Sequence, residues 1–157
     1  IYYETLSPTD QIIILNQLSD QLHPKDFIET ITKDTLESIY AIQQIQEMNG
    51  EAGCHRYVIS NCQSEVNVIE LYALFRLCGW QENLPTIDIV PLFETIEDLN
   101  ASEKIMELLY QLPLYASHLV QRKRQQTIML GFSDGTKDGG YLQANWSIYK
   151  EIGRAHV

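Results

Sequence analysis

The sequence predicts an α/β fold in which leading helices are followed by about three parallel strand–helix units. The first third of its 157 residues carries the apolar periodicity of helices, whereas from Tyr57 onward short apolar runs alternate with amphipathic stretches. Right-handed crossovers would bring the carboxyl ends of the strands to one rim. Because three strands cannot close a barrel and would leave sheet edges open, the domain is predicted to be incomplete.

Two helices are predicted in the leading part of the chain. Ser7 is the expected N-cap of the first, with Pro8 at its first position and Asp10 in its first turn. The second is predicted over Thr32 to Asn49 and stops at Gly50. Its apolar residues are spread so widely around the helix that we expect it to be mostly buried.

Three strands are predicted, at Tyr57–Ser60, Ile87–Phe93 and Thr127–Phe132. A helix is expected after each strand. The first closes near Gly79, and the second is capped by Asn100 with Glu103 three residues later. The third begins near Tyr141, after a glycine-rich turn over residues 133–140.

Composition excludes several classes of partner. The formal net charge of −10 repels nucleic-acid phosphates and acidic membrane surfaces, so we expect neither nucleic acid nor membrane as a partner. There is no long apolar run and no basic leader, which together predict a soluble, cytoplasmic protein. Cys54, Cys62 and Cys78 form no C-x-x-C pair and are interpreted as buried or idle thiols.

Two carboxylates follow predicted strands and are candidate metal ligands. Glu94 comes directly after the apolar run 89–93, and Asp134 follows the run 129–132. They are forty residues apart, which is one strand–helix unit. Acids on neighbouring strand ends suit a hard divalent cation, which prefers oxygen ligands. The alternative is that both residues cap helices or occupy turns.

Lys137 lies in the predicted glycine-flanked turn, three residues after Asp134. A cation there suits an anionic substrate carrying a phosphate or carboxylate, although a lysine in a surface turn is more often a solvated charge. The spacing around Gly135 is not that of a Walker A loop, which excludes an ATPase on this motif. The basic run 121–124 is interpreted as a solvated loop that pairs with nearby acids.

Three stretches carry a resemblance to a known family. His-Arg-Tyr-Val-Ile-Ser at 55–60, Val-Pro-Leu-Phe-Glu-Thr-Ile-Glu-Asp-Leu at 90–99 and Gly-Phe-Ser-Asp-Gly-Thr-Lys-Asp-Gly-Gly at 131–140 resemble, in this order and spacing, the central part of bacterial-type phosphoenolpyruvate carboxylase. The resemblance implies part of a TIM-like α/β barrel inside a largely helical homotetramer. It also implies an enzyme that converts phosphoenolpyruvate and bicarbonate to oxaloacetate and phosphate, through carboxyphosphate and the enolate of pyruvate.

The resemblance implies roles for the same three residues. Glu94 and Asp134 match the family's ligands for Mg²⁺ or Mn²⁺, and Lys137 matches a lysine that lines the active site. The stretch 60–62, Ser-Asn-Cys, departs from the family pattern, and we expect this departure not to touch the metal ligands.

The resemblance also divides the chain. Residues 1–150 are expected to be the central portion of the barrel, with a helical lead-in at 1–50 and strand–helix units at 57–150. The tail 151–157 is predicted to be non-native, because the family pattern breaks there and these residues also translate a sequence that resembles a sequencing-library adapter.

The chain is expected to be an internal fragment that is inactive by itself. The family's catalytic histidine and a substrate-binding arginine segment would precede Ile1, and its glycine- and arginine-rich loop would follow Lys150. Two alternatives stay open: another metal-dependent barrel enzyme acting on phosphoenolpyruvate or pyruvate, or a non-catalytic scaffolding domain.

Overall fold

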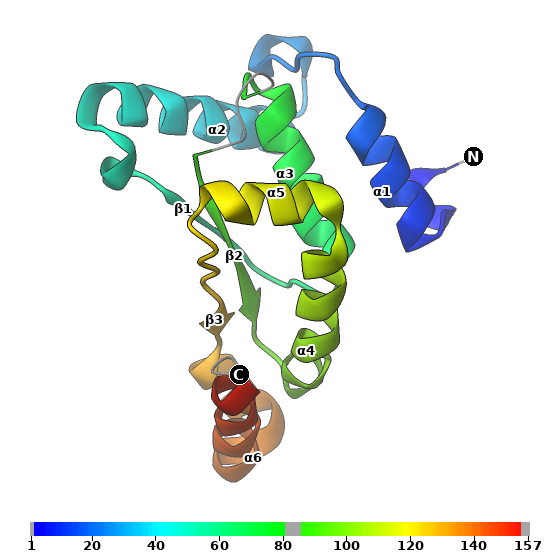
Figure 1. The fold of residues 1–157 in the computed structure, drawn as a ribbon, viewed down its shortest axis with the longest axis vertical. Coiled ribbons are helices and arrows are strands. Elements are labelled where there is room, and N and C mark those ends of the chain that lie inside the picture. Colours follow the sequence, from blue (N-terminus) through cyan, green and yellow to red (C-terminus); the bar gives the residue numbers. More distant parts are fainter. Residues whose placement is uncertain (1, 81–85, 155–157) are drawn as a thin grey trace. The chain divides into compact units, whose positions relative to one another are not determined.

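The computed structural model describes residues 2–80 and 86–154, and it describes side-chain surroundings as far as Lys150. The described chain divides into two compact units. Figure 1 labels the helices and strands of both. The first comprises Ile1–Arg56 and Ile69–Ile87, and the second comprises Tyr57–Val68 and Asp88–Val157. The whole of the predicted tail, 151–157, lies outside the residues whose side chains are described, although the helical backbone continues to Arg154.

The first unit is helical. Its elements are η1 (Tyr3–Thr5), α1 (Pro8–Gln17), η2 (Pro24–Asp26), α2 (Thr30–Asn49), η3 (Glu51–Gly53) and most of α3 (Glu65–Leu77), which begins in the second unit. The predicted start of α1 is confirmed, because the Ser7 hydroxyl accepts a hydrogen bond from the Asp10 N–H at 3.2 Å. The predicted end of α3 is confirmed as well, with Gly79 at φ 110° directly beyond its last turn.

Helix α2 is less buried than its composition predicts. Leu36, Ile39 and Ile42 are buried, but Ile31 and Met48 remain 76% and 75% exposed. The prediction of a mostly buried helix is therefore wrong, because only one face of α2 meets the rest of its unit and the other apolar residues stay in solvent. No described helix is both long and apolar enough to cross a membrane.

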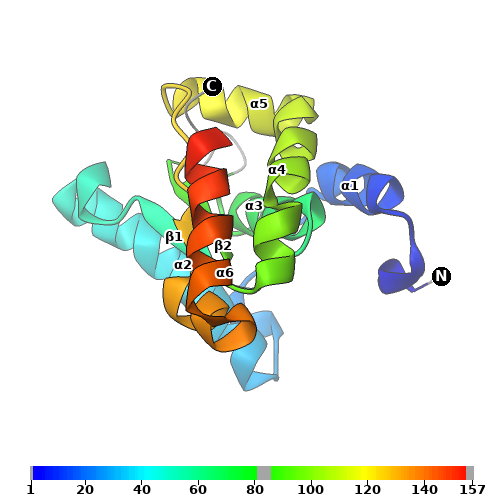
Figure 2. The same ribbon diagram turned by 90° about the horizontal axis from the view of Figure 1, so that it is seen from below.

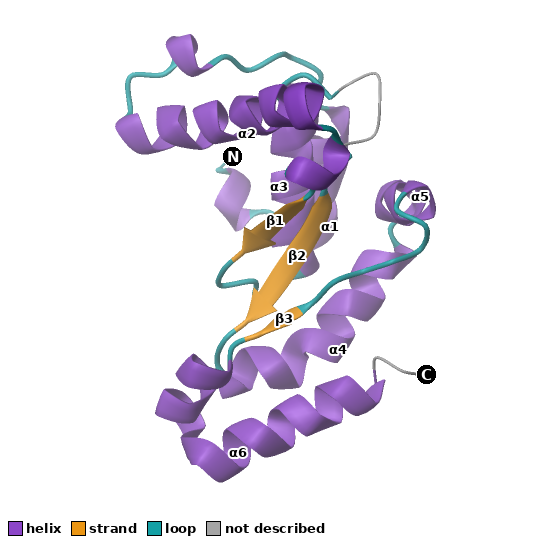
Figure 3. Cartoon of the chain, turned by 90° about the vertical axis from the view of Figure 1, so that its left-hand side faces the viewer, coloured by secondary structure: helices purple, strands orange, loops and turns teal. Residues whose placement is uncertain are grey.

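The second unit is an α/β arrangement, as predicted. Its elements are β1 (Arg56–Ile59), β2 (Asp88–Phe93), α4 (Ile96–Gln111), α5 (Pro113–Gln121), β3 (Met129–Leu130) and α6 (Phe132–Arg154). The strands form one sheet in the order β1-β2-β3, with their arrows running in the same direction (Figure 3). Helix α6 runs beside α4 at the carboxyl end of this sheet (Figure 2).

Strand β3 is shorter than predicted. Only Met129 and Leu130 pair with β2, in the parallel register Leu92↔Met129 and Phe93↔Leu130. The predicted strand Thr127–Phe132 is therefore wrong at both ends, because β3 begins only at Met129 and Phe132 already begins α6. Pro91 is buried inside β2 and directly precedes the residues that pair with β3, so its missing N–H falls outside this β2–β3 ladder.

The predicted cap of the second crossover helix is also wrong. Helix α4 begins at Ile96 and its N-cap is Thr95, whose hydroxyl accepts from the Asp98 N–H at 3.0 Å while the Asp98 carboxylate accepts from the Thr95 N–H at 3.1 Å. Asn100 lies inside the helix, because this reciprocal capping box satisfies the helix end one turn earlier. Helix α5 was not predicted from the sequence. It begins at Pro113, directly after its N-cap Leu112.

Polar contacts fix the other end of the sheet. The Arg122 guanidinium pairs with the Asp88 carboxylate at 2.6 Å, which confirms the predicted ion pairing in the basic run. Gln126 donates to the Ile89 carbonyl at 2.9 Å.

Cys62 and Cys78 are buried and Cys54 is partly buried, and all three are free thiols.

Candidate metal centre

Strand β2 delivers Glu94 to the carboxyl end of the sheet. Ile89, Val90 and Phe93 are buried, and β2 is the central strand between β1 and β3. Glu94 is the first residue after the strand, and its side chain is half-buried. The structure thus places Glu94 where the sequence predicts it, and its role as a metal ligand stays a prediction.

Gly131 joins the ends of β2 and β3. Its N–H donates to the Phe93 carbonyl at 2.7 Å. A Cβ atom built on Gly131 would lie 2.9 Å from the Glu94 Cα and 3.2 Å from the Phe93 carbonyl oxygen. Such distances are shorter than van der Waals contact, so only glycine allows the two strand ends to approach this closely.

Helix α6 leaves β3 immediately and carries the other two candidates. Asp134 lies in its first turn, and Lys137 lies one turn further on. The Lys137 ammonium contacts the Asp134 carboxylate at 2.8 Å, and the two side chains are 74% and 52% exposed. This hydrogen bond, together with the charge of Asp134, raises the pKa of Lys137 above its usual value.

The predicted turn over residues 133–140 is wrong, because the chain from Phe132 to Gly139 is helical and only Gly140 departs from helical geometry, at φ 78° and ψ 165°. The glycines serve close packing. A Cβ on Gly135 would meet the Glu94 carbonyl oxygen at 3.4 Å, and one on Gly139 would meet the Ile96 side chain at 2.6 Å. Lys137 therefore lies in helix α6 and not in a loop.

The carboxylate of Glu94 is oriented from β1. The main-chain N–H of Asn61, just beyond that strand, donates to Glu94 Oε2 at 3.2 Å. Asn61 has φ 53°, a left-handed conformation that asparagine tolerates better than most residues. The backbone of the stretch 60–62 therefore contacts the candidate ligand Glu94. The expectation that the side-chain departures in this stretch leave the metal ligands unaltered stays a prediction.

Asp138 also lies at this rim, and the sequence analysis assigned it no role. Its Oδ2 accepts a hydrogen bond from the Ile96 N–H at 3.0 Å. Ile96 is the first residue of α4, and the N–H groups of a first helical turn have no partner within their helix. Locating the cap at Thr95 from the Thr-x-x-Asp pattern would have shown that the next N–H needs an acceptor.

The donor atoms at the rim fit a hard cation. Glu94 and Asp134 both offer carboxylate oxygens, the ligands that Mg²⁺ and Mn²⁺ favour, and such ions commonly take one or two protein carboxylates with water and substrate oxygens. Among the described residues, no three His, Cys, Asp or Glu side chains gather as a complete metal site. The rim therefore offers a partial ligand set.

These features define a class of protein: an α/β protein with two carboxylates and a lysine at the carboxyl ends of parallel strands. A sequence profile of phosphoenolpyruvate carboxylase matches residues 2–155. The chain belongs to the phosphoenolpyruvate carboxylase family.

Curated relatives agree with this assignment. The phosphoenolpyruvate carboxylase of Nitrosomonas europaea is 34% identical over 143 residues, covering 85% of this chain and 15% of the relative. That of Corynebacterium glutamicum is 34% identical over 157 residues, covering 94% and 17%. That of Mycobacterium leprae is 37% identical over 129 residues, covering 78% and 14%. The chain thus spans about 15% of the length of the relatives it matches.

Proposed function

We propose that this chain supplies the metal-binding rim of a phosphoenolpyruvate carboxylase, which forms oxaloacetate and phosphate from phosphoenolpyruvate and bicarbonate. The observation that carries the proposal is the placement of Glu94 and the first turns of α6 side by side at the carboxyl end of a parallel sheet, in a chain of this family. Substrates of this reaction are anions, and cationic groups at such a rim favour them.

Each rim residue has a distinct proposed role. Glu94 and Asp134 hold Mg²⁺ or Mn²⁺, and the bound ion supplies positive charge where negative charge develops on the reacting oxygens. Lys137, whose ammonium contacts Asp134 at 2.8 Å, supplies a second positive charge for the phosphate or carboxylate of the substrate. The Asn61 N–H holds one oxygen of Glu94 and leaves the other for the cation.

The wider architecture belongs to the same proposal. The sequential order β1-β2-β3 with a helix after each strand supports a segment of a TIM-like barrel, which further strands would close. We propose that the complete protein is a homotetramer and that these 157 residues alone are inactive, because the part of them that the structure describes provides three strands and two of the proposed ligands of the metal.

The proposal is tested on the full-length protein that contains this segment. Oxaloacetate formation is followed by coupling to malate dehydrogenase in the presence of Mg²⁺, for E94Q, D134N and K137M. Each substitution is expected to lower kcat/KM by about 100-fold or more, because it removes a charge that acts on the transition state.

Matched exposed residues provide the controls. E97Q and K104M in α4 and D34N in α2 make the same chemical changes on solvent-facing side chains and are expected to leave activity unchanged. Unimpaired turnover by E94Q and D134N would refute the assigned metal site. A full-length protein that forms no oxaloacetate, yet turns over phosphoenolpyruvate or pyruvate in another reaction, would refute the carboxylase assignment.

A further inference from the structure

The segment 94–96, which includes Glu94, packs closely against the start of α6. Gly131, Gly135 and Gly139 recur every four residues, a spacing that places them on one side of the chain as it enters and follows the helix. Added Cβ atoms there would lie 2.9 Å from the Glu94 Cα, 3.4 Å from its carbonyl oxygen and 2.6 Å from the Ile96 Cγ1. The glycines permit this approach, but they contribute no attraction of their own.

Asp138 supplies a direct polar contact. Its carboxylate accepts from the Ile96 N–H at 3.0 Å, which joins α6 directly to the first residue of α4. The capping box already uses two other N–H groups of this segment: the Thr95 N–H donates to the Asp98 carboxylate, and the Asp98 N–H donates to the Thr95 hydroxyl. The bond from Ile96 to Asp138 is therefore separate from the internal cap of α4.

The position of Asp138 couples it to the metal ligands. Asp138 lies four residues after Asp134, so the two are neighbours one turn apart on the same helix. Its partner Ile96 lies two residues after Glu94, whose carboxylate is held on the other side by the Asn61 N–H. One hydrogen bond thus links the backbone of one candidate ligand to the helix that carries the other.

We propose that Asp138 is a positioning residue, which fixes the distance between the carboxylates of Glu94 and Asp134 by binding the Ile96 N–H. This inference rests on the proposed function, because it assigns Asp138 a purpose at that same metal centre. A cap that only stabilised α4 would change the stability of the protein and leave its affinity for the cation unaltered.

Substitutions at position 138 separate these two roles. D138N keeps a carbonyl oxygen that accepts from Ile96, whereas D138A removes the acceptor. The experiment uses the full-length protein and two readouts: the dissociation constant of Mn²⁺ from electron paramagnetic resonance, and hydrogen exchange of the Ile96 amide followed by mass spectrometry. Both readouts are independent of turnover.

The expected result is a split between the two variants. D138A should lose protection of the Ile96 amide and bind Mn²⁺ roughly 10-fold more weakly, the usual scale for residues that orient a metal ligand. D138N should retain most of both. If D138A fails to fold, D138S replaces it. The serine side chain is polar, but it is shorter than that of aspartate and does not reach the Ile96 N–H.

Two further variants complete the test. D88N breaks the Arg122–Asp88 ion pair at the opposite end of β2 and should lower the melting temperature without weakening Mn²⁺ binding. E94Q should abolish tight Mn²⁺ binding. If E94Q weakens binding while D138A does not, the positioning role is overturned and the metal site stands. Equal weakening by D138N and D138A also overturns it, because charge alone would then set the affinity. If E94Q has no effect, the metal site itself is refuted and the positioning role with it.

Discussion

Gly131 sets the separation of two strand ends. Its N–H bonds the Phe93 carbonyl, and its missing side chain admits the Glu94 backbone. Because the atom that an added Cβ would meet belongs to the backbone, no side-chain rotation relieves the overlap. The residue therefore fixes Glu94 through size, and Asp138 fixes the same segment through a hydrogen bond.

We predict that G131A destabilises the protein by about 1–3 kcal/mol, the usual cost of overpacking a tight contact. G135A is the matched control, because its added Cβ would meet the Glu94 carbonyl oxygen at 3.4 Å, an ordinary contact distance. Urea unfolding followed by circular dichroism measures the difference between the two variants. Equal stabilities for G131A and G135A would contradict the prediction.

Some of the candidate residues could be predicted from sequence patterns and others could not. Glu94 and Asp134 were identified because each follows an apolar strand and both lie in stretches that resemble a family. Asn61 and Asp138 were missed because both act on or through main-chain N–H groups. Such a contact depends on which residue begins the next helix or ends the neighbouring strand, and the pattern of side chains alone does not fix those boundaries.

Elements with strong periodicity and an adjacent cap were predicted well. Helices α1 and α3 begin or end where Ser7 and Gly79 indicate. The start of α6 was not predicted, since its glycines at 135 and 139 are typical of turns. Both nevertheless lie in the helix, where Gly139 is required by the close approach of Ile96. Tertiary contact therefore overrode local preference at this helix.

The cap of α4 provides a test at this scale. T95A is expected to cost about 1 kcal/mol of stability, because the hydroxyl that accepts from the Asp98 N–H is lost. N100A is expected to be neutral or slightly stabilising, because Asn100 is exposed inside the helix, where alanine is the better helix former.

Chemical denaturation of the two variants distinguishes the caps, since the alternative cap at Asn100 predicts the reverse order of stabilities. The two substitutions lie five residues apart in one chain segment and both create alanine.

Each of the two units has a buried thiol in its core. Cys78 belongs to the first unit and Cys62 to the second, and both are fully buried. Burial raises the pKa of each thiol to about 11. An unfolded cysteine titrates at about 8.5, so the unfolded chain releases these protons at a lower pH than the folded chain does.

This difference predicts a loss of stability at alkaline pH. The thiol contribution is fully present below pH 8.5 and is lost progressively as the pH rises towards 11, because the unfolded state then binds fewer protons than the folded state. Melting temperatures measured by circular dichroism between pH 8 and pH 11 should fall accordingly. C62A, although less stable throughout, should fall less steeply over this range. A parallel decline for C62A would contradict the assignment to Cys62.

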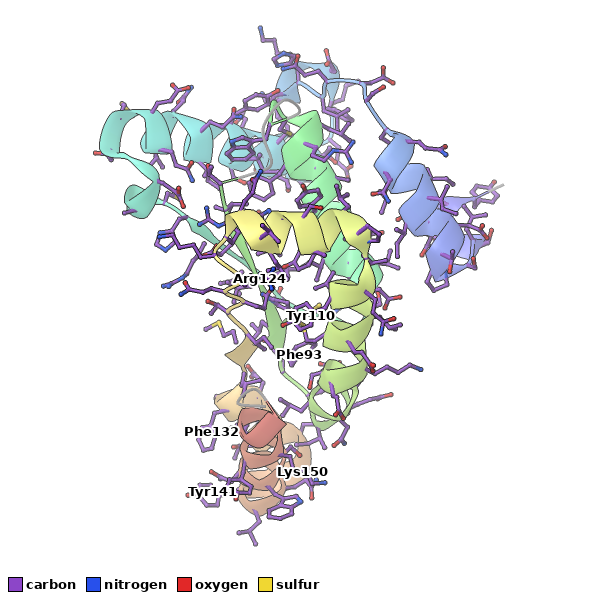
Figure 4. The ribbon with its side chains drawn as sticks, in the orientation of Figure 1. Phe93, Tyr110, Arg124, Phe132, Tyr141 and Lys150 are labelled. Carbon is purple, nitrogen blue, oxygen red and sulfur yellow. The ribbon has the colours of Figure 1, made fainter. Side chains whose placement is uncertain are left out.

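The outer side of α6 is strongly apolar for a surface. Tyr141, Leu142, Trp146 and Tyr149 are 64%, 83%, 53% and 68% exposed. Phe132 and Tyr141 meet edge to face at 6.2 Å (Figure 4), and the Lys150 ammonium lies 5.7 Å from the centre of the Trp146 ring. So much exposed aromatic surface favours association when the chain is made alone.

The contact between Ile96 and Gly139 has an evolutionary consequence. A Cβ at position 139 would lie 2.6 Å from the Ile96 Cγ1, so the two positions share one fixed volume although they are 43 residues apart in sequence. A larger residue at 139 becomes acceptable only when residue 96 shrinks, for instance to alanine. Among diverging descendants of this sequence, substitutions at these two positions should therefore arise as compensating pairs.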